Sequence, residues 1–92
     1  MYAVIGTAKL DPARAGEARQ LAKNILAKAS EAPAFVSGTF ARSADGSAGR
    51  SIIVFESEEA ARALAERAPA MIPADGPTEV NSLEVFEVVD HR

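Results

Sequence analysis

Few side chains in this sequence can do chemistry, and those few are scattered. The chain has no cysteine, which excludes disulfides, thiolate metal sites and a cysteine nucleophile. The single histidine, His91, stands beside Asp90 near the end of the sequence, where we expect fraying rather than a catalytic dyad. We therefore expect no metal site, and neither a Ser/His/Asp set nor a glycine-rich phosphate loop is recognisable.

Two other polar residues have two interpretations each. Tyr2, the only tyrosine, could place a phenol in a pocket, or it could border the core with its hydroxyl in water. Arg14 could meet an anionic or phenolate ligand, or it could extend from the core boundary into solvent. We favour the second interpretation for both. Arg42 and Arg50 flank a loop, and we expect them only to solubilise the strand ends.

The overall charge argues against several classes of partner. The net charge is −3, and the ten Lys and Arg residues are scattered singly, which does not favour nucleic-acid binding. No apolar run is long enough to span a bilayer, so no membrane partner is expected. The N-terminal residues begin strand-like sequence without a basic leader, and we expect a cytoplasmic protein.

Four strand-like segments alternate with two amphipathic helical ones. We expect strands at 2–10, 35–42, 50–56 and 80–89, and helices at 12–32 and 57–71. Asp11 and Ser57 are typical helix caps, and Asp45-Gly46 is a typical hairpin turn. The order predicts one α+β domain over residues 1–92, with a ferredoxin-like βαββαβ fold. Its four-stranded antiparallel sheet should carry both helices on one face.

The strands are apolar on both faces, although two helices can cover only one. Ile52 and Val54 alternate with Ile53 and Phe55, so neither side of this strand is polar. An antiparallel sheet with a wet face normally alternates polar and apolar residues. We therefore predict a homodimer that packs through the helix-free sheet face, with the same patch serving both partners.

The stretch Ser51-Ile-Ile-Val-Phe-Glu-Ser-Glu-Glu-Ala-Ala61 resembles the dimeric α/β-barrel superfamily, in particular its antibiotic-biosynthesis monooxygenase-like branch. In that branch a strand ending in an aromatic residue runs into a helix that opens with acidic residues. The resemblance implies a dimeric α/β barrel with a ligand pocket between the helices and the sheet of each subunit. Some members oxygenate polycyclic phenols or quinols without a cofactor, and others degrade haem.

The residues that carry activity in this family are only partly matched. Phe55 stands where the family often has tryptophan, and Leu64 stands where a histidine is common on the second helix. Thr7 is the nearest counterpart of the amide that haem-degrading members carry on the first strand. With no tryptophan and no helical histidine, haem degradation is disfavoured and no cofactor is expected.

Two hypotheses follow, and the sequence leaves open whether the protein is an enzyme. The first is a cofactor-independent oxygenase that acts on a hydrophobic aromatic metabolite. The second is a non-catalytic dimeric module that binds a small apolar ligand or supports a partner. The alanine-rich helix stripes should let helix and sheet approach closely and leave little room for a large ligand. The candidate pocket residues are Tyr2, Thr7, Arg14, Phe40, Phe55, Leu64 and Met71.

Overall fold

A computed structural model describes residues 1–92 and shows a four-stranded sheet in the order β2-β3-β1-β4. Strand β1 (Tyr2–Leu10) pairs antiparallel with β3 (Ala48–Phe55) on one side and with β4 (Thr78–Glu87) on the other. Strand β2 (Phe35–Arg42) forms the edge beyond β3, also antiparallel. The two longest-range pairings therefore both involve β1, which holds the sheet together.

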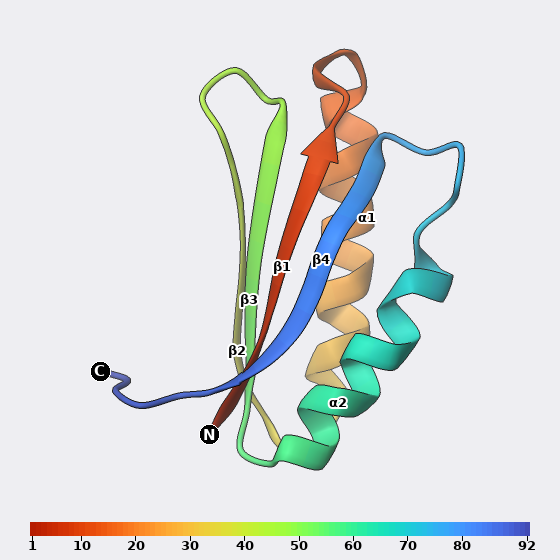
Figure 1. Ribbon diagram of the computed structural model, residues 1–92. Coiled ribbons are helices and arrows are strands. Elements are labelled where there is room, and N and C mark those ends of the chain that lie inside the picture. The colour runs from red at the N-terminus through yellow and green to blue at the C-terminus, as the bar shows by residue number, and fades with distance from the viewer.

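Both helices lie on the same face of this sheet (Figure 1). Helix α1 (Ala15–Ser30) follows a short 3-10 turn at Pro12–Arg14, in which the Asp11 carboxylate accepts a hydrogen bond from the Ala13 backbone N–H at 3.0 Å. Helix α2 (Glu58–Arg67) is capped by Ser57, whose hydroxyl accepts from the Ala60 N–H at 3.2 Å. A second 3-10 turn, Ala68–Met71, continues it. These caps satisfy backbone donors that a helix start leaves unpaired.

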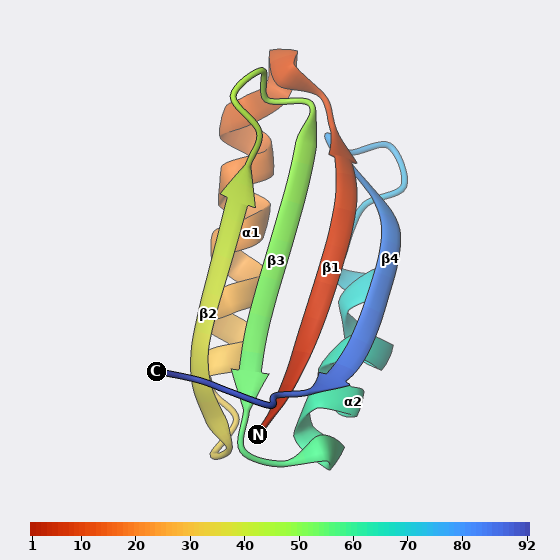
Figure 2. The same ribbon diagram turned by 60° about the vertical axis from the view of Figure 1, so that its left-hand side comes forward.

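The ferredoxin-like βαββαβ prediction is confirmed, with small differences at the ends of the elements. Strand β3 begins at Ala48, two residues before the predicted start, because its residues pair with the end of β1. Strand β4 runs over Thr78–Glu87 instead of 80–89, since Thr78 pairs with Leu10. After Glu87 the chain leaves the sheet on the helix-free side (Figures 1 and 2). None of the helices is long and apolar enough to cross a membrane.

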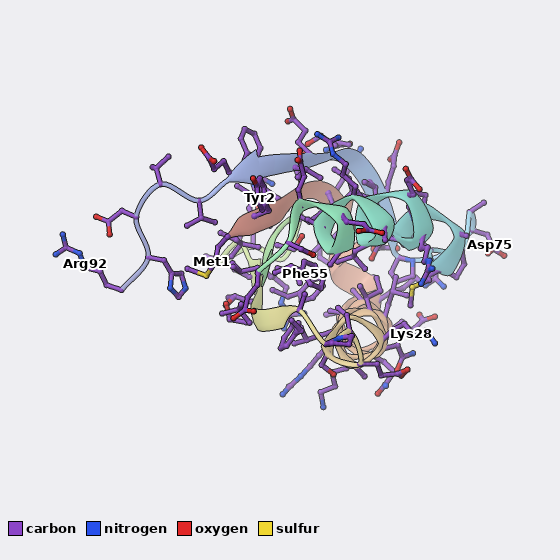
Figure 3. The ribbon with its side chains drawn as sticks, turned by 90° about the horizontal axis from the view of Figure 1, so that it is seen from below. Met1, Tyr2, Lys28, Phe55, Asp75 and Arg92 are labelled. Carbon is purple, nitrogen blue, oxygen red and sulfur yellow. The ribbon has the colours of Figure 1, made fainter.

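Large side chains close one end of the space between helices and sheet. Tyr2 pairs with Phe55 and Val4 pairs with Ile53, all on the helix-covered face. Phe55 is only 1% exposed, and its ring meets that of Phe35 edge to face with the centroids 6.1 Å apart. Figure 3 shows Phe55 between the sheet and the helices. This packed end, completed by residues of α1 and α2, is the hydrophobic core: Val4, Ile25, Ala29, Ile53, Phe55, Ala61, Leu64 and Ala68.

The helix-free face carries apolar side chains that remain open to solvent. Ile5 and Ile52 pair across β1 and β3 on this face, and Ile52 is 43% exposed. Phe86 on β4 is 46% exposed and pairs with Ala3 on the same side. No helix lies over this face of the sheet (Figure 2), so part of its apolar surface stays open to solvent in the single chain.

The loop between β2 and β3 is organised around Asp45. Its carboxylate accepts hydrogen bonds from the Ser43 hydroxyl at 2.8 Å, the Ser47 hydroxyl at 2.7 Å and the Ser47 N–H at 3.0 Å. Gly46 has a φ of 77°, the one positive φ in the chain, as the predicted Asp-Gly turn requires. Hydrogen bonds from Ser47, then Ser43, lower the pKa of Asp45 to about 2.

A carboxyl titration followed by NMR should show this shift directly. We expect the Asp45 resonance to titrate at about pH 2, below its ordinary value of 3.8. Because the folded-state pKa is lowered, the stabilising contribution is fully present above the ordinary pKa and is lost as the pH falls through the folded value. Ser47→Ala should raise the Asp45 pKa, whereas Ser30→Ala, on α1, should not. An Asp45 midpoint near 3.8 would contradict the loop geometry.

Candidate functional site

A cavity of about 400 Å³ lies between α1, the sheet and the end of α2. It adjoins the packed core, because Val4, Ile53 and Leu64 belong to both, and it extends away from Phe55 toward Gly6 and Gly49. It is apolar in character, since 15 of its 23 lining residues are hydrophobic. Strand β1 and β3 supply its floor, α1 supplies one wall, and Leu64, Ala68 and Ile72 close it beneath α2. A cavity of this size and character falls in the range of small-molecule sites.

The cavity exists because small residues face each other across β1 and β3. Gly6 pairs with Ser51 and Ala8 pairs with Gly49, where the packed end has Tyr2 with Phe55 and Val4 with Ile53. A Cβ atom on Gly6 would lie 2.5 Å from the Ser51 Oγ, so a larger residue does not fit there without movement. Opposite this floor, α1 presents Ala18 and Ala22. The small residues therefore leave a cavity of about 400 Å³ between helix and sheet instead of drawing the two into close contact at this end.

Three of the predicted pocket residues border this cavity. Phe40 on β2 pairs with Ser51 on the helix-covered face and is 36% exposed at the cavity edge. Leu64 on α2 is buried and closes the inner wall. Thr7 borders the cavity, but its register with Arg50 and Ser82 puts its side chain on the helix-free face. There the Thr7 and Ser82 hydroxyls share a hydrogen bond with an O–O distance of 2.6 Å.

The other four predicted residues lie outside the lining. Phe55 is part of the packed core, and Tyr2 and Met71 are half-buried against it. They belong to the closed end of the domain, where Leu64 packs in the same core cluster, whereas Phe40 is not part of that cluster. Of the predicted set, Leu64 alone belongs to both the core and the cavity lining.

Arg14 is held away from the cavity by its own neighbours. Its Nε and Nη2 donate to the two carboxylate oxygens of Glu17 at 2.7 and 2.8 Å, and its Nη1 donates to the Asp75 carbonyl at 2.9 Å. The hydrogen bonds with Glu17 raise the pKa of Arg14 and lower the pKa of Glu17. Arg14 therefore ties the start of α1 to the loop before β4, and both side chains are open to solvent.

Three arginines border the cavity, Arg19, Arg42 and Arg50, and none of them is among the predicted pocket residues. Arg42 at the end of β2 pairs with Gly49 on the helix-covered face, and its Nη1 donates to the Ala15 carbonyl on α1 at 3.4 Å. Arg19 borders the cavity from α1, one turn beyond Ala15. The sequence alone predicts only a solubilising role for Arg42, because it does not place this residue opposite α1. The register of β2 against β3 is the information that identifies Arg42, because it puts this residue on the helix-covered face.

The lining offers hydroxyl and guanidinium groups, and no carboxyl, imidazole, thiol, thioether or phenol. Haem iron is held in proteins by histidine, cysteine, methionine or tyrosine, so these residues do not fit a haem. The chain also has no group of three or more His, Cys, Asp or Glu residues close enough to hold a metal ion. The arrangement can enclose an apolar molecule and contact it with arginine at its edge.

Comparisons with known proteins find the same fold in several solved structures. No protein-family model and no curated protein sequence matches the chain. Among solved structures, it is similar to SnoaB, a cofactor-independent oxygenase from Streptomyces nogalater, with a TM-score of 0.74 and 15% identity over 98% of this chain and 94% of that one. It is also similar to the monooxygenase ActVA-Orf6 of Streptomyces coelicolor in complex with nanaomycin D, with a TM-score of 0.60 and 23% identity over 99% and 91% of the two chains.

A third similar structure is MhuD from Mycobacterium tuberculosis, a heme-degrader with two hemes bound in its active site. Its TM-score is 0.62, with 25% identity over 100% of this chain and 99% of that one. These neighbours extend over the whole chain and share the antibiotic-biosynthesis monooxygenase-like fold of the dimeric α/β-barrel superfamily. The resemblance seen in the sequence is confirmed at the level of the fold.

Proposed function

We propose that this chain binds a hydrophobic aromatic metabolite in the cavity between α1 and the sheet and oxygenates it without a cofactor. The observation that carries the proposal is the cavity itself, with about 400 Å³ of largely apolar space. Its volume suits a ligand of a few fused rings, and apolar walls exclude water from the ligand. The fold neighbours SnoaB and ActVA-Orf6, one a cofactor-independent oxygenase and the other a monooxygenase, support the type of reaction.

In cofactor-free oxygenation, the substrate itself supplies the electrons that reduce O₂. One atom of O₂ becomes the new carbonyl oxygen at a ring carbon that loses two hydrogens, and the other atom leaves with those hydrogens as water. The balance needs no external reductant. The protein then has to bind the ring system, orient it and keep bulk water away, which are tasks that an apolar cavity performs.

A non-catalytic ligand-binding module is the second candidate. It is favoured by the lining, which contains no carboxyl, imidazole, amine or phenol to move a proton. The groups present, arginine and hydroxyl side chains, can hold a ligand but are weak general bases.

Turnover under oxygen separates the two candidates. The purified protein should be mixed with a panel of anthrols, anthrones and quinols, with product formation followed by absorbance and mass spectrometry under ¹⁸O₂. The enzyme proposal expects one ¹⁸O atom per product, at a rate above that of the buffer alone. Saturable binding of the same compounds without ¹⁸O incorporation would overturn catalysis and establish the binding module.

We further propose that the functional unit is a homodimer that packs through the helix-free face. Ile52 and Phe86 expose much of their side chains on this face, and burying such apolar surface is favourable. A symmetric partner would cover the patch on both copies at once. The dimeric barrel implied by the superfamily resemblance agrees with this arrangement.

Ile52→Lys should convert the dimer to a monomer, because a lysine would place its charge in the centre of the apolar interface. We expect sedimentation equilibrium at micromolar protein to give the dimer mass for the parent chain and the monomer mass for the variant. Ala27→Lys, on the exposed side of α1, is the matched control and should remain a dimer. A parent chain that sediments as a stable monomer at this concentration would refute the interface.

A further inference from the structure

The charged side chains that border the cavity are all of one sign. The chain has 13 acidic and 10 basic residues, and its net charge is −3. None of the acidic residues lines the cavity, whereas three arginines do. The charged side chains of the lining are therefore positive, whereas the net charge of the chain is negative. A negative ligand would meet no carboxylate inside the cavity.

Two of these arginines face the cavity and have no acidic partner. Arg42 lies on the helix-covered face of β2, and its contact to the Ala15 carbonyl brings its guanidinium across to α1. Arg19 borders the same space from α1. Neither takes part in the ion pairs of the chain, which join Arg14 to Glu17, Lys28 to Glu31, Arg62 to Glu58 and Arg92 to Asp90.

The third arginine is arranged differently. Arg50 pairs with Thr7 and Ala41 on the helix-free face, and its Nη1 donates to the carbonyl of the preceding Gly49 at 2.8 Å. The guanidinium groups available to a cavity ligand are therefore those of Arg42 and Arg19.

An aromatic ring lies next to this cationic edge. Phe40 and Arg42 are two residues apart on β2 and share the helix-covered face. Their Cα atoms are therefore about 7 Å apart along the strand. A ring that lies against Phe40 can extend an anionic group to Arg42, and the planar guanidinium suits a carboxylate or phenolate.

We propose that the cavity selects aromatic ligands that carry one anionic group, with the rings inside and the anion at the edge between Arg42 and Arg19. This specificity rests on the proposed function, because it concerns the same cavity. It also bears on reactivity, since a cation nearby lowers the pKa of a phenol and favours the electron-rich phenolate that reacts with oxygen.

Two fluorescent probes with the same aromatic framework test the proposal. Anilinonaphthalene sulfonate carries an anion, and N-phenylnaphthylamine is neutral. We expect the parent chain to bind the sulfonate about tenfold more tightly, as one charge-assisted contact allows. Arg42→Gln should remove most of this preference and Arg19→Gln part of it, because each should weaken the sulfonate far more than the neutral probe. Arg42→Lys should retain more of the preference than Arg42→Gln, because it keeps the charge.

Arg67→Gln is the matched control, since Arg67 ends α2, is exposed and does not line the cavity. It should bind both probes as the parent does. Competition by naphthoate then tests a carboxylate and competition by naphthol tests a phenol. Because naphthol is mostly uncharged at neutral pH, its competition supports an anionic ligand only if it weakens in Arg42→Gln. Equal binding of the two probes, unaltered in Arg42→Gln, would overturn the anion proposal while leaving the ligand cavity in place. Failure of both probes and both competitors to bind would overturn the cavity proposal itself.

Discussion

Phe55→Ala should lower the free energy of unfolding by about 3–5 kcal/mol, the usual cost of truncating a buried phenylalanine. Phe55 is 1% exposed, and its loss would also remove the edge-to-face contact with Phe35. Domains of this kind are stabilised by about 5–15 kcal/mol in total, so the variant should lose a large share of its stability and unfold at a much lower urea concentration. Urea unfolding followed by circular dichroism measures the change.

Phe40→Ala provides the matched control for this experiment. The same atoms are removed, but Phe40 is 36% exposed and borders open space instead of packed side chains. We expect a loss less than half as large, because little new cavity is created. Equal losses for the two variants would show that the packed end does not dominate stability.

Ala22→Trp should abolish ligand binding while leaving the fold intact. Ala22 lines the cavity from α1, and an indole there would occupy much of the space of about 400 Å³. Because the volume already exists, the stability change should stay below the cost of about 1–3 kcal/mol seen when packed cores are overfilled. We expect the affinity for N-phenylnaphthylamine to fall by at least about tenfold, which corresponds to about 1.4 kcal/mol of binding free energy.

The chain has no tryptophan of its own, so the new residue also reports its surroundings by fluorescence. Ala22→Trp should emit at a shorter wavelength than Ala27→Trp, whose indole would lie on the exposed side of α1. Ala27→Trp should bind the probe as the parent does. Unchanged probe binding by Ala22→Trp would mean that the ligand site lies elsewhere.

The order of elements could be predicted because its boundaries are marked by local chemistry. Asp11-Pro12, Pro33, Asp45-Gly46 and Ser57 each stop or start an element by their own backbone preferences. The predicted bounds of β1 and β2 agree with the structure. Strands β3 and β4 begin earlier than predicted, because pairing with β1 recruits residues whose own side chains do not indicate a strand.

The family resemblance implied a pocket between the helices and the sheet, but the residues alone could not predict its place and shape, because these depend on which residues face each other across strands. Gly6, Ala8, Gly49 and Ser51 are unremarkable in sequence and form a hollow only through the β1–β3 register. Thr7 depends on the register in the same way. A shift of β1 by one residue would move the Thr7 side chain from the helix-free face to the cavity face. Arg42 gains its place beside α1 from tertiary packing, which no local pattern in β2 specifies.

The gradient of residue size along β1 and β3 has a consequence for how such a sequence can diverge. One end of the two strands pairs large residues with large ones, and the other pairs small with small. Substitutions at the small end alter the shape of the hollow, although a side chain at Gly6 requires the Ser51 hydroxyl to move, whereas substitutions at the large end are purged because the domain unfolds. Related sequences can therefore change their ligand through substitutions at the small end of β1 and β3, while the residues at the large end stay the same.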